Sequence, residues 1–322
     1  KSDLNIAEVI DKLLEMLDDY GFGHINRTII LRGLLACMEE DIYRTDWTRL
    51  TDKKRGELQC RLPTIVEPTM AAMERAAQFL NSIGVYNDRL LPYSSQIVIL
   101  TAFFLNCKQP SRRQSEFLKR WFWVSSYTGW FASASTTRVG HLMNEMRDKV
   151  SLESAPSTLE NMRMEEPAQS FPKTFNMSSA RARTWLLVLL GLNPMDNNGK
   201  LLPKPWKLVA EHGPNAVGYI AATVQNKDLG SSPANRILRI TKDRSQGWNW
   251  LSDLKKNARN EVLESHGIPS KAWEPLLSGD RDAFIKMRQD HLIQLEIDHM
   301  KEQGVALPLD ATTPQAAPID TE

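Results

Sequence analysis

Three residues in the second half of the chain are of types that nucleases use. His212, Asn235 and Asp243 each lie in a short run rich in glycine, proline or charged residues. A histidine can activate water, and a divalent ion such as Mg²⁺ can stabilise the phosphate transition state. These residues are therefore candidate catalytic residues. The metal ligands stay unknown, and the spacing by itself is also common in proteins without such a site.

Positive charge is concentrated in two stretches that are candidates for binding DNA phosphates. Contacts from Lys and Arg release counterions from DNA, and aromatic rings beside them can stack bases. In the first stretch the cations lead into Trp121-Phe122-Trp123. The alternative for the first stretch is that Phe117, Trp121 and Val124 form the buried stripe of a helix whose cations face solvent. The alternative for the second stretch is that its cations are simply a solvated surface. The DNA-binding candidates are Arg112, Arg113, Lys119, Arg236, Arg239, Lys242 and Arg244.

Several other chemistries have no support in the sequence. It contains no Gly-rich phosphate loop, GxSxG elbow, HExxH pair or kinase motif. Cys37, Cys60 and Cys107 are widely spaced, which indicates reduced, buried thiols in a cytosol. His291 and His299 lie in a charged helical pattern, where solvent exposure is the simpler interpretation.

Composition limits the class of protein. The chain has 322 residues, 42% hydrophobic and 25% charged, with a net charge of +1. This is globular usage without a global attraction to nucleic acid or membrane, so any DNA contact must be local. No apolar run is long enough for a membrane helix, and we expect a cytoplasmic protein with no membrane partner. Because the chain begins at Lys1 without Met, we expect a trimmed or partial sequence.

The elements that must position these residues are mostly helices. Apolar residues recur at helical spacing through the first half, and Asn26 is a suitable cap for one helix. The pattern therefore predicts a helical bundle domain over residues 1–150. Its predicted helices are Leu4–Leu17, Thr28–Met38, Val66–Ile83, Ser94–Cys107, Arg112–Tyr127 and Thr136–Val150.

The second half predicts a smaller α-rich domain over residues 179–304, so the fold class is mainly α. Residues 151–178 are rich in Pro and Ser, which indicates a linker or an extended surface strap, and residues 305–322 have the composition of a disordered tail. Short strands are predicted at Lys207–Ala210 and Arg236–Ile240, whereas Gly218–Val224 fits either type. Helices are predicted at Arg181–Leu192, Gly247–Glu264, Ser270–Leu277 and Asp280–Gln303.

Short landmarks follow one another in a family-like order over residues 1 to about 304. Taken together they resemble the GmrSD-type restriction proteins, a family that includes SspE-like phage-defence proteins. The landmarks are Asp19-Tyr20-Gly21-Phe22-Gly23, Leu90-Leu91-Pro92-Tyr93, Phe103-Phe104, Arg120-Trp121-Phe122-Trp123, the Ser/Thr-rich Ser133–Thr137, Pro233-Ala234-Asn235-Arg236-Ile237-Leu238, Glu264-Ser265-His266-Gly267-Ile268-Pro269 and Phe284–Arg288.

The resemblance implies a DNA-acting component of an antiphage, modification-dependent restriction system. Family members join a ParB-like, nucleotide-hydrolysing N-terminal domain to a C-terminal nuclease domain of His-Asn-His type. The DGQQR-like run of the first domain does not occur here, so we expect that NTPase-like domain outside this sequence or on a partner chain. A homo-oligomer is also compatible with the resemblance.

In the enzymatic version, His212 would be the general base of an Mg²⁺-dependent or similar endonuclease, Asn235 would orient it or a ligand, and Asp243 would ligate the metal. Two departures from the family pattern keep an alternative open. The family's His-Ile-Phe-Pro-like run is His212-Gly213-Pro214 here, and Lys242-Asp243-Arg244 replaces a later Asn. The alternative is a non-catalytic module that senses DNA or scaffolds a partner.

Overall fold

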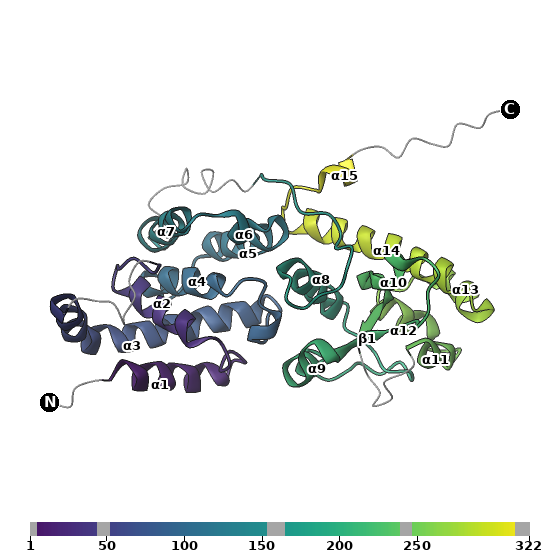
Figure 1. The fold of residues 1–322 in the computed structure, drawn as a ribbon, viewed down its shortest axis with the longest axis horizontal. Coiled ribbons are helices and arrows are strands. Elements are labelled where there is room, and N and C mark those ends of the chain that lie inside the picture. The colour runs from purple at the N-terminus through teal and green to yellow at the C-terminus, as the bar shows by residue number, and fades with distance from the viewer. Residues whose placement is uncertain (1–4, 44–51, 153–164, 239–246, 313–322) are drawn as a thin grey trace. The chain divides into compact units, whose positions relative to one another are not determined.

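The chain is mainly α-helical, as the sequence predicts. A computed structural model describes residues 5–43, 52–152, 165–238 and 247–312 (Figure 1). The chain forms two compact units. The first contains Lys1–Phe122 and Trp130–Met164, and the second contains Trp123–Gly129 and Glu165–Glu322. The last turns of one helix, α5 (Arg112–Thr128), therefore belong to the second unit.

The first unit is built around one apolar helix. Every residue of α4 (Ser95–Asn106) from Gln96 to Phe104 is buried, because this helix is hydrophobic on all sides and must be covered by others. It packs against α2, α3 and α7 and the π-helical turn Met146–Val150. The other helices of this unit are α1 (Ile6–Asp18), α2 (Arg27–Cys37), α3 (Asp52–Ser82), the first turns of α5, α6 (Trp130–Ser133) and α7 (Thr136–Glu145).

Local sequence explains the starts of the first two helices. The Asn26 side chain accepts a hydrogen bond from the Thr28 N–H and caps α2, as predicted. For α1 the cap is Asn5, whose side chain accepts from the Ala7 N–H.

Helix α3 is longer than the sequence indicates. The prediction begins it at Val66, after Pro63, whereas the helix runs from Asp52 and contains both Pro63 and Pro68. A proline inside a helix removes a backbone hydrogen bond and is normally unfavourable. Here Leu58, Leu62 and Val66 are buried four residues apart, so packing of one helix face overrides the local preference.

The second unit is assembled on two helices. Most of α8 (Ala180–Gly191) is buried, and α14 (Arg281–Glu302) packs against it. Strands β1 (Val217–Tyr219) and β2 (Arg236–Leu238) pair antiparallel, with Val217 opposite Leu238. The remaining helices described in this unit are α9 (Trp206–His212), α10 (Lys227–Ser231), α11 (Gly247–Ser252), α12 (Arg259–Ser265), α13 (Trp273–Ser278) and α15 (Leu309–Thr312).

Several predictions for this half need correction. Residues 207–210 are helical in α9, where Val209 is the buried residue, so the predicted strand is wrong. The second strand is found at Arg236–Leu238, and the rest of its predicted range, Arg239 and Ile240, lies outside the described residues. The single helix predicted over Gly247–Glu264 is two, because α11 ends at Ser252.

The segment before α8 packs as a strap on the second unit. Within it, the Ala168 N–H bonds to the Ala306 carbonyl and the Gln169 N–H to the Tyr127 carbonyl. The same contact corrects only the predicted start of the tail at residue 305, because Val305 is buried and α15 follows. Residues 313–322 lie outside the described part of the chain.

The cysteines are free thiols, and two of the three match the prediction of burial. Cys37 and Cys107 are buried, whereas Cys60 is exposed on α3. Burial raises the pKa of the Cys37 thiol to about 11. Over the described residues, no helix combines the length and the apolar character that crossing a bilayer requires.

Candidate nucleic-acid interface

His212 lies in solvent at the end of α9. Its side chain is 58% exposed, and its Nε2 lies 3.9 Å from a carboxylate oxygen of Glu211. Gly213 follows with a positive φ of 54°, which turns the chain sharply toward β1. His212 is therefore accessible to a large ligand, but nothing among its described neighbours fixes the orientation of its ring.

Asn235, in contrast, is buried and fully engaged by backbone groups. Only 1% of the residue's surface is exposed. Its Nδ2 donates to the carbonyls of Ala221 at 3.0 Å and Gly230 at 3.1 Å, and its Oδ1 accepts from the Ala221 N–H at 2.9 Å. Because buried polar groups require partners, Asn235 holds the two ends of the loop between β1 and β2 together.

The strand register places His212 and Asn235 toward opposite ends of the two-stranded ladder. Asn235 directly precedes Arg236, which pairs with Tyr219, whereas His212 comes five residues before Val217, which pairs with Leu238. The third predicted catalytic residue, Asp243, lies outside the described residues. Of the three candidates, the two that the structure describes, His212 and Asn235, are therefore not brought together.

The described residues also do not fit a divalent metal. Mg²⁺ prefers several oxygen ligands in octahedral geometry. The Asn235 oxygen is already bound to a backbone N–H, and Glu211 is the carboxylate paired with His212. In the part of the chain that the structure describes, no group of three His, Cys, Asp or Glu side chains is placed to hold an ion.

A buried arginine, which sequence reasoning missed, supports the Asn235 segment from the other side. The Arg288 guanidinium donates to the carbonyls of Ala234 at 2.6 Å, Arg236 at 2.5 Å and His266 at 2.8 Å. Complete burial lowers the pKa of Arg288 to about 9. In the sequence, Arg288 stood out only as the last residue of the Phe284–Arg288 landmark, and that landmark did not assign it a role.

The charge cluster of the second unit is described only in part. Arg236 is half-buried, and its guanidinium lies 3.5 Å from the centre of the Tyr219 ring. Such a cation–π contact holds the charge near an aromatic surface. The other predicted DNA-binding residues here, Arg239, Lys242 and Arg244, lie outside the described residues.

Helix α5 separates its aromatic residues from its cations. Phe117, Trp121 and Val124 are buried, as the simpler of the two interpretations predicts. Arg112, Arg113, Glu116, Lys119 and Arg120 are exposed. With about 100° of rotation per residue, these five side chains project within about 120° of one another. We name this surface the α5 cation face.

The α5 cation face carries a single carboxylate. Arg112 pairs with Glu116 at 2.8 Å, an exposed pair that contributes little to stability. Among the described residues, no carboxylate pairs with Arg113 or Lys119. Three of the predicted DNA-binding residues, Arg112, Arg113 and Lys119, are therefore brought together on one accessible helical surface.

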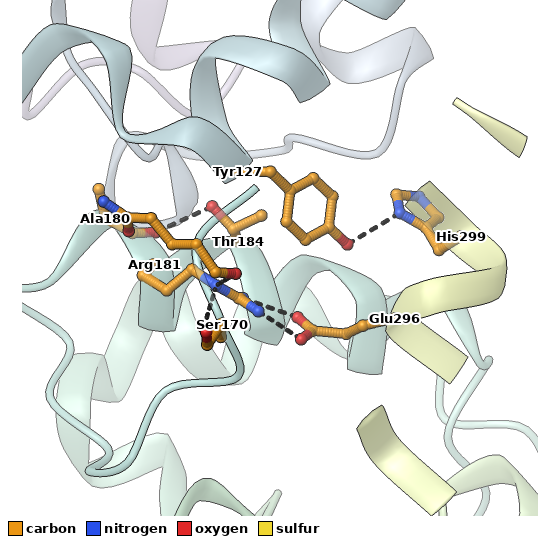
Figure 2. Close-up of polar contacts among 8 residues, drawn as sticks. Tyr127, Ser170, Ala180, Arg181, Thr184, Glu296 and His299 are labelled. Atoms are coloured by element: carbon orange, nitrogen blue, oxygen red, sulfur yellow. Dashed lines mark hydrogen bonds and ion pairs between the residues drawn. The ribbon is translucent and has the colours of Figure 1, made fainter. Parts of the chain in front are cut away.

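A buried polar cluster lies at the other end of α5, within the second unit (Figure 2). Arg181 from α8 makes a two-pronged ion pair with Glu296 from α14, at 2.8 and 2.5 Å, and its Nε donates to the Ser170 carbonyl. Burial by itself would lower the pKa of Arg181, but Glu296 raises it above its ordinary value. Sequence reasoning did not find this pair.

Tyr127 and His299 complete the cluster. The Tyr127 hydroxyl lies 3.0 Å from His299 Nδ1, and the Arg181 guanidinium lies over the tyrosine ring at 5.2 Å. Burial, together with the charge of Glu296, raises the pKa of Tyr127 well above 10. The prediction that His299 lies on a solvated face is wrong, since it contacts both Tyr127 and the Trp123 ring.

Comparison with known proteins leaves the landmarks as the basis for the family resemblance. No family model matches the sequence, and no curated protein matches it.

Proposed function

We propose that this chain is a DNA-binding component of an antiphage, modification-dependent restriction system. The α5 cation face is the observation that supports DNA binding, and the ordered landmarks support the restriction system. Exposed cations on one helix can contact successive phosphates, and each neutralised phosphate releases counterions. A protein with a net charge of +1 needs such a local surface to bind DNA.

The proposal is tested by measuring duplex DNA affinity as a function of salt. Arg113→Ala combined with Lys119→Ala removes two exposed charges, and we expect weaker binding with a salt slope shallower by up to about 2. The matched control is Lys286→Ala combined with Lys301→Ala, which removes the same charge from α14. Equal loss in both double variants, or binding that does not depend on salt, would count against the α5 cation face.

The non-catalytic version is favoured by the environment of Asn235. Both N–H donors of its amide are bound to the carbonyls of Ala221 and Gly230, and its buried oxygen already accepts from the Ala221 N–H, so the side chain holds the loop and does not face a substrate. In this version the module binds or senses DNA in the cytoplasm, and an NTPase-like domain on the same or another chain acts on the result. The chain can also pair with a second copy of itself.

Metal-dependent cleavage is the second candidate, and the exposure of His212 is the observation that favours it. Its side chain is 58% exposed, so the imidazole is accessible to a phosphate of a bound strand. Plasmid nicking with Mg²⁺ or Mn²⁺ tests this version. Nicking that is lost in His212→Ala supports it, and equal background in the wild type and the variant ends it.

A further inference from the structure

The aromatic residues that follow α5 differ from those inside it. Trp121 is buried, whereas Trp130 and Phe131 in α6 are half-buried and are followed by exposed Ser133, Ser135, Thr136 and Thr137. Burial therefore excludes base stacking on Trp121, whereas the rings of Trp130 and Phe131 are partly accessible. All of these residues belong to the first unit.

Packing fixes the position of Trp130. Its ring meets Phe131 edge to face, with centroids 5.0 Å apart. Phe131 in turn contacts the rings of Trp121 at 6.3 Å and Tyr93 at 5.4 Å. These contacts hold α6 against the buried Trp121 ring, so little side-chain entropy remains to be lost when a ligand binds at Trp130.

A cation lies over the Trp130 ring of this cluster. The Arg138 guanidinium is 5.3 Å from the centre of the Trp130 ring. Arg138 is in the first turn of α7, where its N–H bonds to the Ser135 side chain that caps the helix. Aromatic rings, such as that of tryptophan, and guanidinium planes are side-chain surfaces on which unpaired bases stack.

The cluster follows the α5 cation face in the sequence and packs on the buried side of the same helix. Arg120 of that face directly precedes Trp121, whose ring contacts Phe131. Cations that follow the phosphate backbone next to an aromatic surface are the combination that binds single-stranded nucleic acid. The exposed hydroxyls of Thr136 and Thr137 can add hydrogen bonds to phosphates.

We propose that Trp130 and Arg138 form a stacking site for unpaired DNA bases. This proposal rests on the proposed DNA-binding function and specifies that the first unit binds single-stranded DNA. The α5 cation face supplies the sequence-independent attraction. The Trp130–Arg138 pair adds affinity only where a base is free of its partner strand.

The test compares strands that differ only in their bases. An oligothymidine of about 20 nucleotides exceeds the usual single-strand site size, and an abasic strand of the same length keeps its phosphates. Fluorescence anisotropy should show tighter binding of oligothymidine by the wild type. We expect Trp130→Ala to weaken that binding roughly 5- to 100-fold, to leave the abasic strand unaffected, and Trp130→Phe to retain most of the affinity.

The matched control is Trp273→Ala in the second unit. Trp273 is also half-buried, and Arg259 lies over its ring at 3.9 Å. Its loss should leave oligothymidine affinity unchanged. If Trp130→Ala does not fold, the wild-type comparison of the two strands and the Arg138→Gln variant still decide the question.

The outcomes separate this inference from the proposed function. Equal wild-type affinity for oligothymidine and the abasic strand, or an equal loss for both strands in Trp130→Ala, overturns the stacking site. If salt-dependent duplex binding persists in that case, DNA binding through the α5 cation face stands. Absence of binding to every strand and to duplex overturns both.

Discussion

At the scale of single residues, the type of a residue does not predict its role in this protein. His212 and Asn235 are both typical of nuclease sites, yet one is in solvent and the other is bound to three backbone groups. Substitution of Asn235 should therefore change the free energy of unfolding of the protein more than substitution of His212. A loss of activity in an Asn235 variant would therefore be explained by disruption of the loop between β1 and β2, without a catalytic role for Asn235.

Asn235→Ala should lower the free energy of unfolding by about 3 kcal/mol, because it leaves buried backbone groups of Ala221 and Gly230 without partners. Denaturant titration measures this change. His212→Ala is the matched control and should stay within about 0.5 kcal/mol of the wild type, since its side chain is mostly exposed. Similar stabilities of the two variants would contradict the assigned role.

The Arg181–Glu296 pair gives a second prediction at this scale. Glu296→Gln should lower the free energy of unfolding by about 3–5 kcal/mol, because it leaves the buried guanidinium without its counter-charge. Arg181→Met combined with Glu296→Leu removes both charges and should be less destabilised than Glu296→Gln. A double variant that unfolds more easily than the single variant would show that the ion pair itself supplies net stability.

At the scale of elements, tight turns decide where the helices of the first unit lie. Gly21 ends the turn after α1 with a φ of 86°, and a Cβ at this position would lie 2.1 Å from the Tyr86 carbonyl oxygen. Its N–H also bonds to the Asp18 carbonyl. The backbone therefore approaches too closely for any side chain, and the positive φ is strained for residues other than glycine.

Gly21→Ala should destabilise the protein by at least about 2 kcal/mol, through steric overlap and backbone strain. Gly140 provides a control of opposite sign, because it lies inside α7 with no atom near its missing Cβ. Gly140→Ala should raise helix stability by about 0.5–1 kcal/mol. Thermal melts followed by circular dichroism compare the two, and shifts in the same direction would contradict this explanation.

At the scale of the whole molecule, the core of the second unit makes stability depend on pH. His266 is fully buried between Met195 and Trp250, and its Nε2 lies 2.9 Å from the Met195 carbonyl. Since a carbonyl only accepts, Nε2 carries the proton of the neutral ring. Burial, with the charge of Arg288, lowers the pKa of His266 to about 4.

The unfolded chain binds a proton at His266 near pH 6.5, whereas the folded chain binds it near pH 4. The contribution of His266 to the free energy of unfolding is therefore fully present above pH 6.5, and it falls by about 3 kcal/mol as the pH drops to 4. Unfolding curves of the wild type and His266→Gln at several pH values measure it. The variant should lose less stability over this interval, and parallel curves would show that other groups cause the acid sensitivity.

Local sequence patterns were sufficient to predict the class of fold and most helices of the first unit. Apolar periodicity and the Asn26 cap depend on neighbours along the chain, so they can be recognised without tertiary contacts. The same local information predicted that Phe117, Trp121 and Val124 form a buried stripe with the cations of α5 outside it.

Only the tertiary structure decided the roles of the polar residues. Asn235, Arg288 and the Arg181–Glu296 pair bond to groups that are 5 to 115 residues away in sequence, and no local pattern encodes such partners. The length of α3 and the packing of Val305 were likewise decided by burial against distant elements. Burial converts a residue that could do chemistry into one that holds the fold, because in the core every polar group must be matched by a specific partner.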